Sequence, residues 1–65
     1  MVMVNGKEQG LSEEILVSEL LELMGYQADR VAVEHNGRMV SRSRLSETTI
    51  RDGDILEVIS FVGGG

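Results

Sequence analysis

The residues most able to carry chemistry close the printed sequence, which ends in Val62-Gly63-Gly64-Gly65. Glycine lacks a Cβ and reaches most backbone angles, so a glycine run is flexible when free and thin when bound. Extended over these positions, the backbone would reach about 13 Å. We therefore expect Gly63 and Gly64 to thread a narrow tunnel in another protein. There the carboxylate of Gly65 could meet a nucleotide that the partner holds.

A plainer interpretation of this ending is a frayed terminus, because the ends of chains are often poorly ordered. Two features weigh against it. The glycines directly follow an expected strand, and the Ser and His residues of common linkers do not accompany them. We expect Phe61 and Val62 to form the base of the tail. Phe61 could pack on the sheet or be exposed to a partner, and the sequence does not choose between the two.

The rest of the sequence does not suggest an enzyme. It holds one histidine, His35, and no cysteine, so we expect neither thiol chemistry nor a metal site, and we interpret His35 as a surface residue. There is no nucleophile–base pair, phosphate-binding glycine loop or credibly spaced pair of carboxylates. Arg38, Arg42 and Arg44 form a basic group that is most often plain surface, although it could also contact an acidic partner.

Length and composition narrow the class of protein. A chain of 65 residues allows one domain, and 42% hydrophobic content is typical of a globular fold. The net charge of −5 argues against nucleic acid and suits a basic partner surface. The apolar runs are too short to cross a membrane, and no signal peptide opens the chain. We therefore expect a cytoplasmic protein that is a monomer when free.

The first half of the chain predicts a β-hairpin and then a helix. Residues 1–5 favour a strand, Asn5-Gly6 is a strong hairpin turn signal, and residues 7–11 would return as the second strand. After a lead-in loop over residues 12–16, apolar residues recur at helical spacing. They are Val17, Leu20, Leu21 and Met24. Gly25 stands where a glycine commonly ends a helix, so we expect the helix over residues 17–25.

The second half predicts another hairpin and a long final strand. Residues 31–35 and 38–40 flank a second Asn-Gly turn. Residues 41–49 are polar and irregular, with Leu45 and Ile50 as apolar anchors, and residues 51–54 form a tight turn. Residues 55–61 are the strongest strand, with apolar residues on both faces. Such a strand belongs near the middle of a sheet.

These elements predict an α+β fold in which one helix crosses a mixed sheet of four to five strands, because the helix cannot bury its apolar stripe alone. The first and last strands should form the centre of the sheet. We expect residues 1–61 to make this domain and residues 62–65 to be a flexible glycine tail.

The ordered set of motifs resembles the ThiS family of sulfur carriers, within the ubiquitin-like β-grasp superfamily. The resemblance covers essentially the whole chain. Its matching segments are Asn5-Gly6-Lys7, Val17-Ser18-Glu19-Leu20-Leu21, Val31-Ala32-Val33-Glu34-His35-Asn36-Gly37, Val40-Ser41-Arg42-Ser43, Asp52-Gly53-Asp54 and Ile59-Ser60-Phe61-Val62-Gly63-Gly64-Gly65. Ser41 departs from the family, in which many members carry proline, and this affects the local turn rather than the chemistry.

The resemblance implies a β-grasp fold and a relay of reactions at Gly65. A ThiF-type, E1-like adenylyltransferase would activate the Gly65 carboxylate with ATP and magnesium. Sulfur, usually from a cysteine desulfurase, would convert it to a thiocarboxylate. A ThiG-type thiazole synthase would then use that sulfur in thiamine biosynthesis. The chain itself would be a carrier with no bound cofactor.

Three related functions remain open at this point. One is a MoaD-like sulfur donor for molybdopterin, although such chains are usually longer. Another is a carrier for a different sulfur pathway, such as tRNA thiolation. The third is a ubiquitin-like modifier that forms isopeptides with lysines. A simple interaction module that uses the face of the sheet is a further alternative, and it would not need the terminal glycines.

Overall fold

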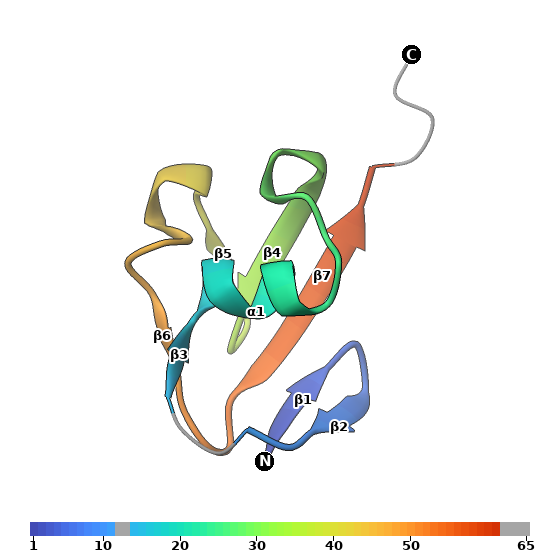
Figure 1. The fold of residues 1–65 in the computed structure, drawn as a ribbon, viewed down its shortest axis with the longest axis vertical. Coiled ribbons are helices and arrows are strands. Elements are labelled where there is room, and N and C mark those ends of the chain that lie inside the picture. The colour runs from blue at the N-terminus through green and yellow to red at the C-terminus, as the bar shows by residue number, and fades with distance from the viewer. Residues whose placement is uncertain (12–13, 62–65) are drawn as a thin grey trace.

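The computed structural model describes residues 1–11 and 14–61. Five strands form one sheet (Figure 1). In spatial order they are β2 (Lys7–Gln9), β1 (Val2–Val4), β7 (Ile55–Ser60), β4 (Val31–His35) and β5 (Arg38–Val40). β7 pairs in parallel with β1 and antiparallel with β4. The sheet is therefore mixed, and the prediction that the first and last strands form its centre is confirmed.

Both predicted hairpins are present. Asn5 and Asn36 each have a φ of 52°, and the following glycines, Gly6 and Gly37, have φ of 80° and 86°. Two successive residues with positive φ are what a two-residue type I′ turn requires, and Asn-Gly meets that requirement at low steric cost. The turns fix the registers, which place Val4 opposite Lys7 and His35 opposite Arg38.

The predicted helix is also present, as α1 (Val17–Leu23). Its buried residues are Val17, Leu20 and Leu21. Met24, which the sequence places on the same apolar stripe, follows the last helical residue and is exposed. Gly25 follows with φ of 83°, the left-handed backbone that glycine adopts readily after a helix. At the other end the Leu16 N–H donates to Glu19 Oε1 at 2.8 Å, which satisfies one of the amides that a helix start leaves unpaired.

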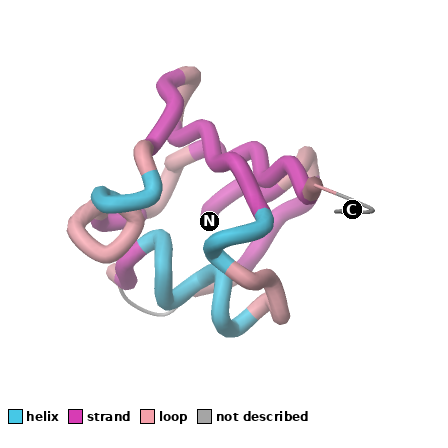
Figure 2. The backbone as a smooth tube through the Cα atoms, turned by 90° about the horizontal axis from the view of Figure 1, so that it is seen from above, coloured by secondary structure: helices cyan, strands magenta, loops and turns pink. Residues whose placement is uncertain are grey.

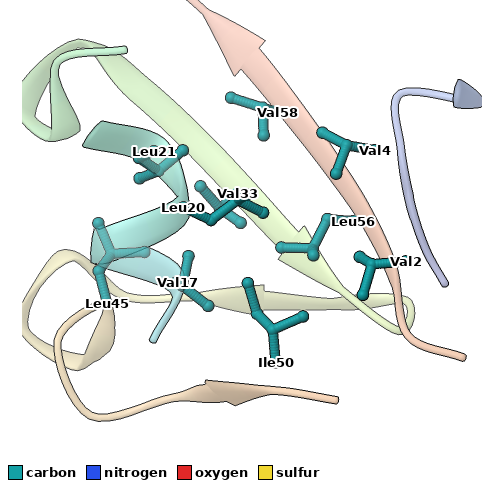
Figure 3. Close-up of a cluster of buried hydrophobic side chains, with 10 residues drawn as sticks. All are labelled: Val2, Val4, Val17, Leu20, Leu21, Val33, Leu45, Ile50, Leu56 and Val58. Atoms are coloured by element: carbon teal, nitrogen blue, oxygen red, sulfur yellow. The ribbon is translucent and has the colours of Figure 1, made fainter. Parts of the chain in front are cut away.

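The core lies between α1 and one face of the sheet. Figure 2 shows the helical segments gathered on one side of the strands. The buried side chains meet between them, as Figure 3 shows. They are Val2, Val4, Val17, Leu20, Leu21, Val33, Leu45, Ile50, Leu56 and Val58. Leu45 and Ile50 are thus the anchors that the sequence predicts. Neither α1 nor any other helix in residues 1–11 and 14–61 has the length and apolar character to span a membrane.

Two predicted loops are wrong in part. Ile15–Leu16 form strand β3, which pairs antiparallel with β6 (Thr49–Ile50) in a separate two-stranded sheet. Strands of two residues are too short to show a period-two pattern, so no local signal marks them in the sequence. Short 3-10 turns, η1 (Ala28–Arg30) and η2 (Arg42–Arg44), occupy other parts of the expected irregular segments.

Candidate functional site

Phe61 directly follows β7 and is the last residue the structure describes. Its N–H donates to the Arg30 carbonyl at 2.9 Å, which extends the contact between the end of β7 and the start of β4. Its side chain is 59% exposed. Of the two alternatives that the sequence left open for Phe61, exposure is therefore the one observed. Val62, Gly63, Gly64 and Gly65 lie outside the described residues, so their roles stay predictions.

The sheet has an outer face, away from α1, that carries apolar side chains along β7. Ile55 and Ile59 are each 52% exposed, whereas Leu56 and Val58 between them are buried. This alternation follows from the strand period of two. Ile55, Ile59 and Phe61, which we call the outer patch, thus run along the central strand up to the point where the described chain stops. Exposed apolar residues in a row can dock a partner protein.

Two carboxylates share the outer face with this patch, and one of them, Glu57, lies between Ile55 and Ile59 along β7. Glu57 of β7 lies directly opposite Glu34 of β4 in the antiparallel register, and Ile59 lies opposite Ala32. Like charges directly opposite each other destabilise a sheet. A basic group on a bound partner would offset that repulsion. The outer face is therefore suited to a partner surface that is apolar with flanking lysine or arginine.

Two asparagine side chains hold β7 in place. Asn5 Oδ1 accepts from the Val58 N–H at 2.7 Å, and Asn5 Nδ2 donates to the Val58 carbonyl at 3.2 Å. At the other end of β7, Asn36 Oδ1 accepts from the Ile55 N–H at 2.8 Å. The sequence identifies both residues as turn formers only. Their second role depends on β7, which is far away along the chain.

His35 differs from the surface residue that the sequence predicts. Its side chain is only 22% exposed, and its Nε2 lies 2.8 Å from Asp54 Oδ2. Burial alone would raise the pKa of Asp54, but hydrogen bonds from His35, the Arg51 N–H and Asn36 outweigh it and hold that pKa below its usual range. This cluster ties the turn before β7 to the β4–β5 hairpin. Within residues 1–11 and 14–61, three metal-binding side chains do not come together anywhere.

The sequence matches the ThiS family over residues 2–65. The chain belongs to the ThiS family. It is 35% identical to the sulfur carrier protein ThiS of Thermus thermophilus over 65 residues, which span all of both chains. A crystal structure of the thiamine biosynthesis protein ThiS from Geobacter metallireducens has a TM-score of 0.82 and 42% identity. That match covers 98% of this chain and 97% of the other.

A third relative is longer. The chain is 38% identical over 64 residues to a thiazole synthase of Paramagnetospirillum magneticum, and the match takes in 98% of this chain but only 20% of that protein. The chain therefore spans about a fifth of that relative's length. With the ThiS matches, the predicted β-grasp fold is confirmed, and the chain is a ThiS-family sulfur carrier of thiamine biosynthesis rather than an enzyme.

Proposed function

We propose that this ThiS-family chain carries sulfur as a thiocarboxylate on Gly65 and delivers it for thiazole formation. One observation carries the proposal. The chain matches a ThiS sulfur carrier over the whole length of both proteins, and the last three residues of its sequence are glycines. Residues 1–61 would be the folded domain that partners recognise. Residues 62–65 would be the flexible tail, with Gly63 and Gly64 threading into the partner's active site.

The first step is activation of the carboxylate. A carboxylate is a poor acyl donor until it carries a good leaving group. A ThiF-type adenylyltransferase would join the Gly65 carboxylate to AMP from ATP and release pyrophosphate. Magnesium and basic groups of that enzyme would stabilise the phosphate charge. The carrier contributes the acyl group and the docking surface, and it needs no cofactor of its own.

In the second step a persulfide, formed by a donor such as a cysteine desulfurase, would attack the Gly65 carbonyl and release AMP. A thiol reductant would then cleave the S–S bond of the resulting acyl disulfide and leave the thiocarboxylate on Gly65. A ThiG-type thiazole synthase would then take the sulfur. The relative from Paramagnetospirillum magneticum supports this partner, because a segment similar to this chain lies within a protein named thiazole synthase. The match to the ThiS family favours this pathway over the molybdopterin alternative.

The described surface supports docking next to the tail. The outer patch of Ile55, Ile59 and Phe61 runs along β7 toward the tail, with Glu34 and Glu57 beside it. A partner that covers this patch would receive the tail directly. The net charge of −5 would speed the encounter with a basic enzyme surface. We place the free carrier in the cytoplasm as a monomer, without nucleic acid or membrane partners.

Exchange of labelled pyrophosphate into ATP tests the activation step. The purified chain is mixed with a ThiF-type enzyme, ATP and magnesium. We expect exchange that depends on the chain and is lost when Gly65 is deleted. Gly10→Ala is the matched control, because Gly10 has an ordinary φ and the position that a Cβ would occupy is open space. Exchange that survives deletion of Gly65 would contradict the proposal.

A further inference from the structure

A shallow hollow of about 410 Å³ lies beside the edge strand β5. It is lined by the guanidinium-bearing Arg38 of β5 and Arg44 of η2 and by the imidazole of His35 at the end of β4, and Ser41 and Thr48 add hydroxyl groups. In Figure 1 the segment that holds η2 follows β5 and turns back toward β6. Three separate elements therefore contribute to one basic concave surface.

The backbone around the hollow is held by specific contacts. Arg38 lies opposite His35 in the β4–β5 register, so both belong to the same face of the sheet. The His35 ring is held by a hydrogen bond between its Nε2 and Asp54 Oδ2, which are 2.8 Å apart. The Arg44 N–H donates to the Ser41 carbonyl at 2.9 Å, and the Thr48 hydroxyl donates to the Arg44 carbonyl at 2.8 Å. The backbone positions that carry the two arginines are thus set by the fold.

The two guanidinium groups lack carboxylate partners among the described residues. The ion pairs found there join Arg51 to Glu14, His35 to Asp54 and the N-terminal amine to Asp52. Asp54, which contacts His35, already accepts hydrogen bonds from Asn36 and the Arg51 N–H. Two like charges around one hollow repel each other. A bound anion would offset that repulsion.

The arrangement favours a phosphate group over a carboxylate. Each guanidinium offers a planar set of N–H donors that matches two acceptor oxygens. A carboxylate has two oxygens, which one arginine can satisfy, whereas a phosphate has enough oxygens for both arginines. The volume also lies in the range of small-molecule sites. We propose that this hollow binds the phosphate group of a small phosphorylated molecule.

This site is separate from the outer patch. β5 is an edge strand, and β4 lies between it and β7, which leads to Phe61. Substitutions in the hollow should therefore leave the outer patch unchanged. The proposal does not rest on the proposed sulfur transfer, and each can fail without the other.

Amide chemical shifts of the isotope-labelled full chain, followed by NMR, test the proposal. Inorganic phosphate is added at constant pH and ionic strength, with acetate as the carboxylate probe. We expect saturable shifts confined to residues 35–48 and at least tenfold weaker binding of acetate. Arg38→Gln and Arg44→Gln should each weaken phosphate binding by about tenfold, the value for one lost charged hydrogen bond.

Arg42→Gln is the matched control, because it removes the same charge from the same turn. The Arg42 guanidinium donates to the Asp29 carbonyl at 3.2 Å and does not line the hollow. The affinity of the Arg42→Gln variant for phosphate should stay within about twofold of the affinity of the parent chain. Equal weakening by Arg42→Gln, shifts that do not saturate, or equal binding of acetate would overturn the proposal, since each indicates a general charge effect.

A second comparison identifies the source of the phosphate. Glycerol phosphate should bind at least as tightly as inorganic phosphate if the ligand is a small molecule. A phosphoserine peptide that binds much more tightly than glycerol phosphate would overturn the small-molecule proposal in favour of a phosphorylated protein. The spectra of each variant also report whether the fold is intact.

Discussion

Asn5 Oδ1 accepts a hydrogen bond from the Val58 N–H at 2.7 Å, and these two residues are 53 positions apart. β1 ends at Val4, and its last backbone contact with β7 comes from the Asn5 N–H, which donates to the Leu56 carbonyl at 2.9 Å. The Asn5 side chain continues that pairing at the next step along β7. The first hairpin turn therefore also holds the central strand at a point three residues before Phe61.

Replacing Asn5 tests this contact. Asn5→Gly preserves the positive φ but leaves the Val58 N–H and carbonyl without their partner. We expect the free energy of unfolding to fall by about 1–3 kcal/mol, the cost of unsatisfied buried polar groups. Urea unfolding measures it, and Lys7→Ala on the exposed strand β2 is the control. A loss no larger than that of the control would show that the contact does not stabilise β7.

The lowered pKa of Asp54 predicts that the free energy of unfolding depends on pH in the acidic range. Its pKa is lower in the folded protein than its usual value, so its contribution is fully present above the ordinary aspartate pKa of about 3.9. That contribution is lost as the pH falls through the lower, folded-state pKa. We expect the parent chain to be more stable than Asp54→Asn at neutral pH, and the difference to shrink in acid. Unfolding curves measured across this range check it.

Asp29→Asn is the matched control for that experiment, because no hydrogen bond of the Asp29 side chain is found in the described part of the chain. At neutral pH, the Asp29→Asn substitution should lower the free energy of unfolding by less than Asp54→Asn does. A difference for Asp54→Asn that grows in acid would have the wrong sign and would reject the proposed role of the His35–Asp54 contact.

The second, two-stranded sheet should be essential to the core. Ile50 of β6 is completely buried among the core residues. Ile50→Ala should lower the free energy of unfolding by about 2–5 kcal/mol, and Ile50→Val by about 0.5–1.5 kcal/mol. Leu23→Ala, at a side chain that is 75% exposed, is the control. Chemical denaturation measures these losses. Equal losses in the free energy of unfolding for Ile50→Ala and Leu23→Ala would contradict this packing.

The outer patch should affect partner binding more than stability. Phe61→Ala should raise the carrier concentration needed for half-maximal pyrophosphate exchange by about tenfold, as for a moderate interface hot spot. The fold should remain intact, because Phe61 is largely exposed. Leu23→Ala removes an exposed apolar residue of α1 and should have little effect on exchange. Equal effects of the two substitutions would place the docking surface elsewhere.

Local sequence signals account for most of the fold. The two Asn-Gly turns fix both hairpins, the helical spacing from Val17 locates α1, and the alternation after Ile55 locates β7. Because both faces of that strand carry apolar residues, the sequence does not show which face is buried. The chemistry at Gly65 also comes from the sequence, and it remains a prediction because the tail lies outside the described residues. The outer patch follows from the same alternation once the central position of β7 is known.

The parts that the sequence did not predict depend on long-range contacts. β3 and β6 are each two residues long and form only because Ile15 lies opposite Ile50. The Asn5–Val58 and His35–Asp54 contacts join residues that are 53 and 19 positions apart. Turn propensity explains why asparagine occupies position 5, but it does not indicate what the side-chain amide binds. Such pairings become visible only when the strands are placed in the sheet.

The mass of the intact chain tests the central claim most directly. The chain is incubated with ATP, magnesium, a ThiF-type enzyme and a sulfur source, and then analysed by mass spectrometry. The proposed function predicts a mass increase equal to replacement of one oxygen by sulfur, located at Gly65 and absent when Gly65 is deleted. The control is the same mixture with an established sulfur carrier in place of this chain. If that carrier is converted and this chain stays unmodified, the proposed function is contradicted.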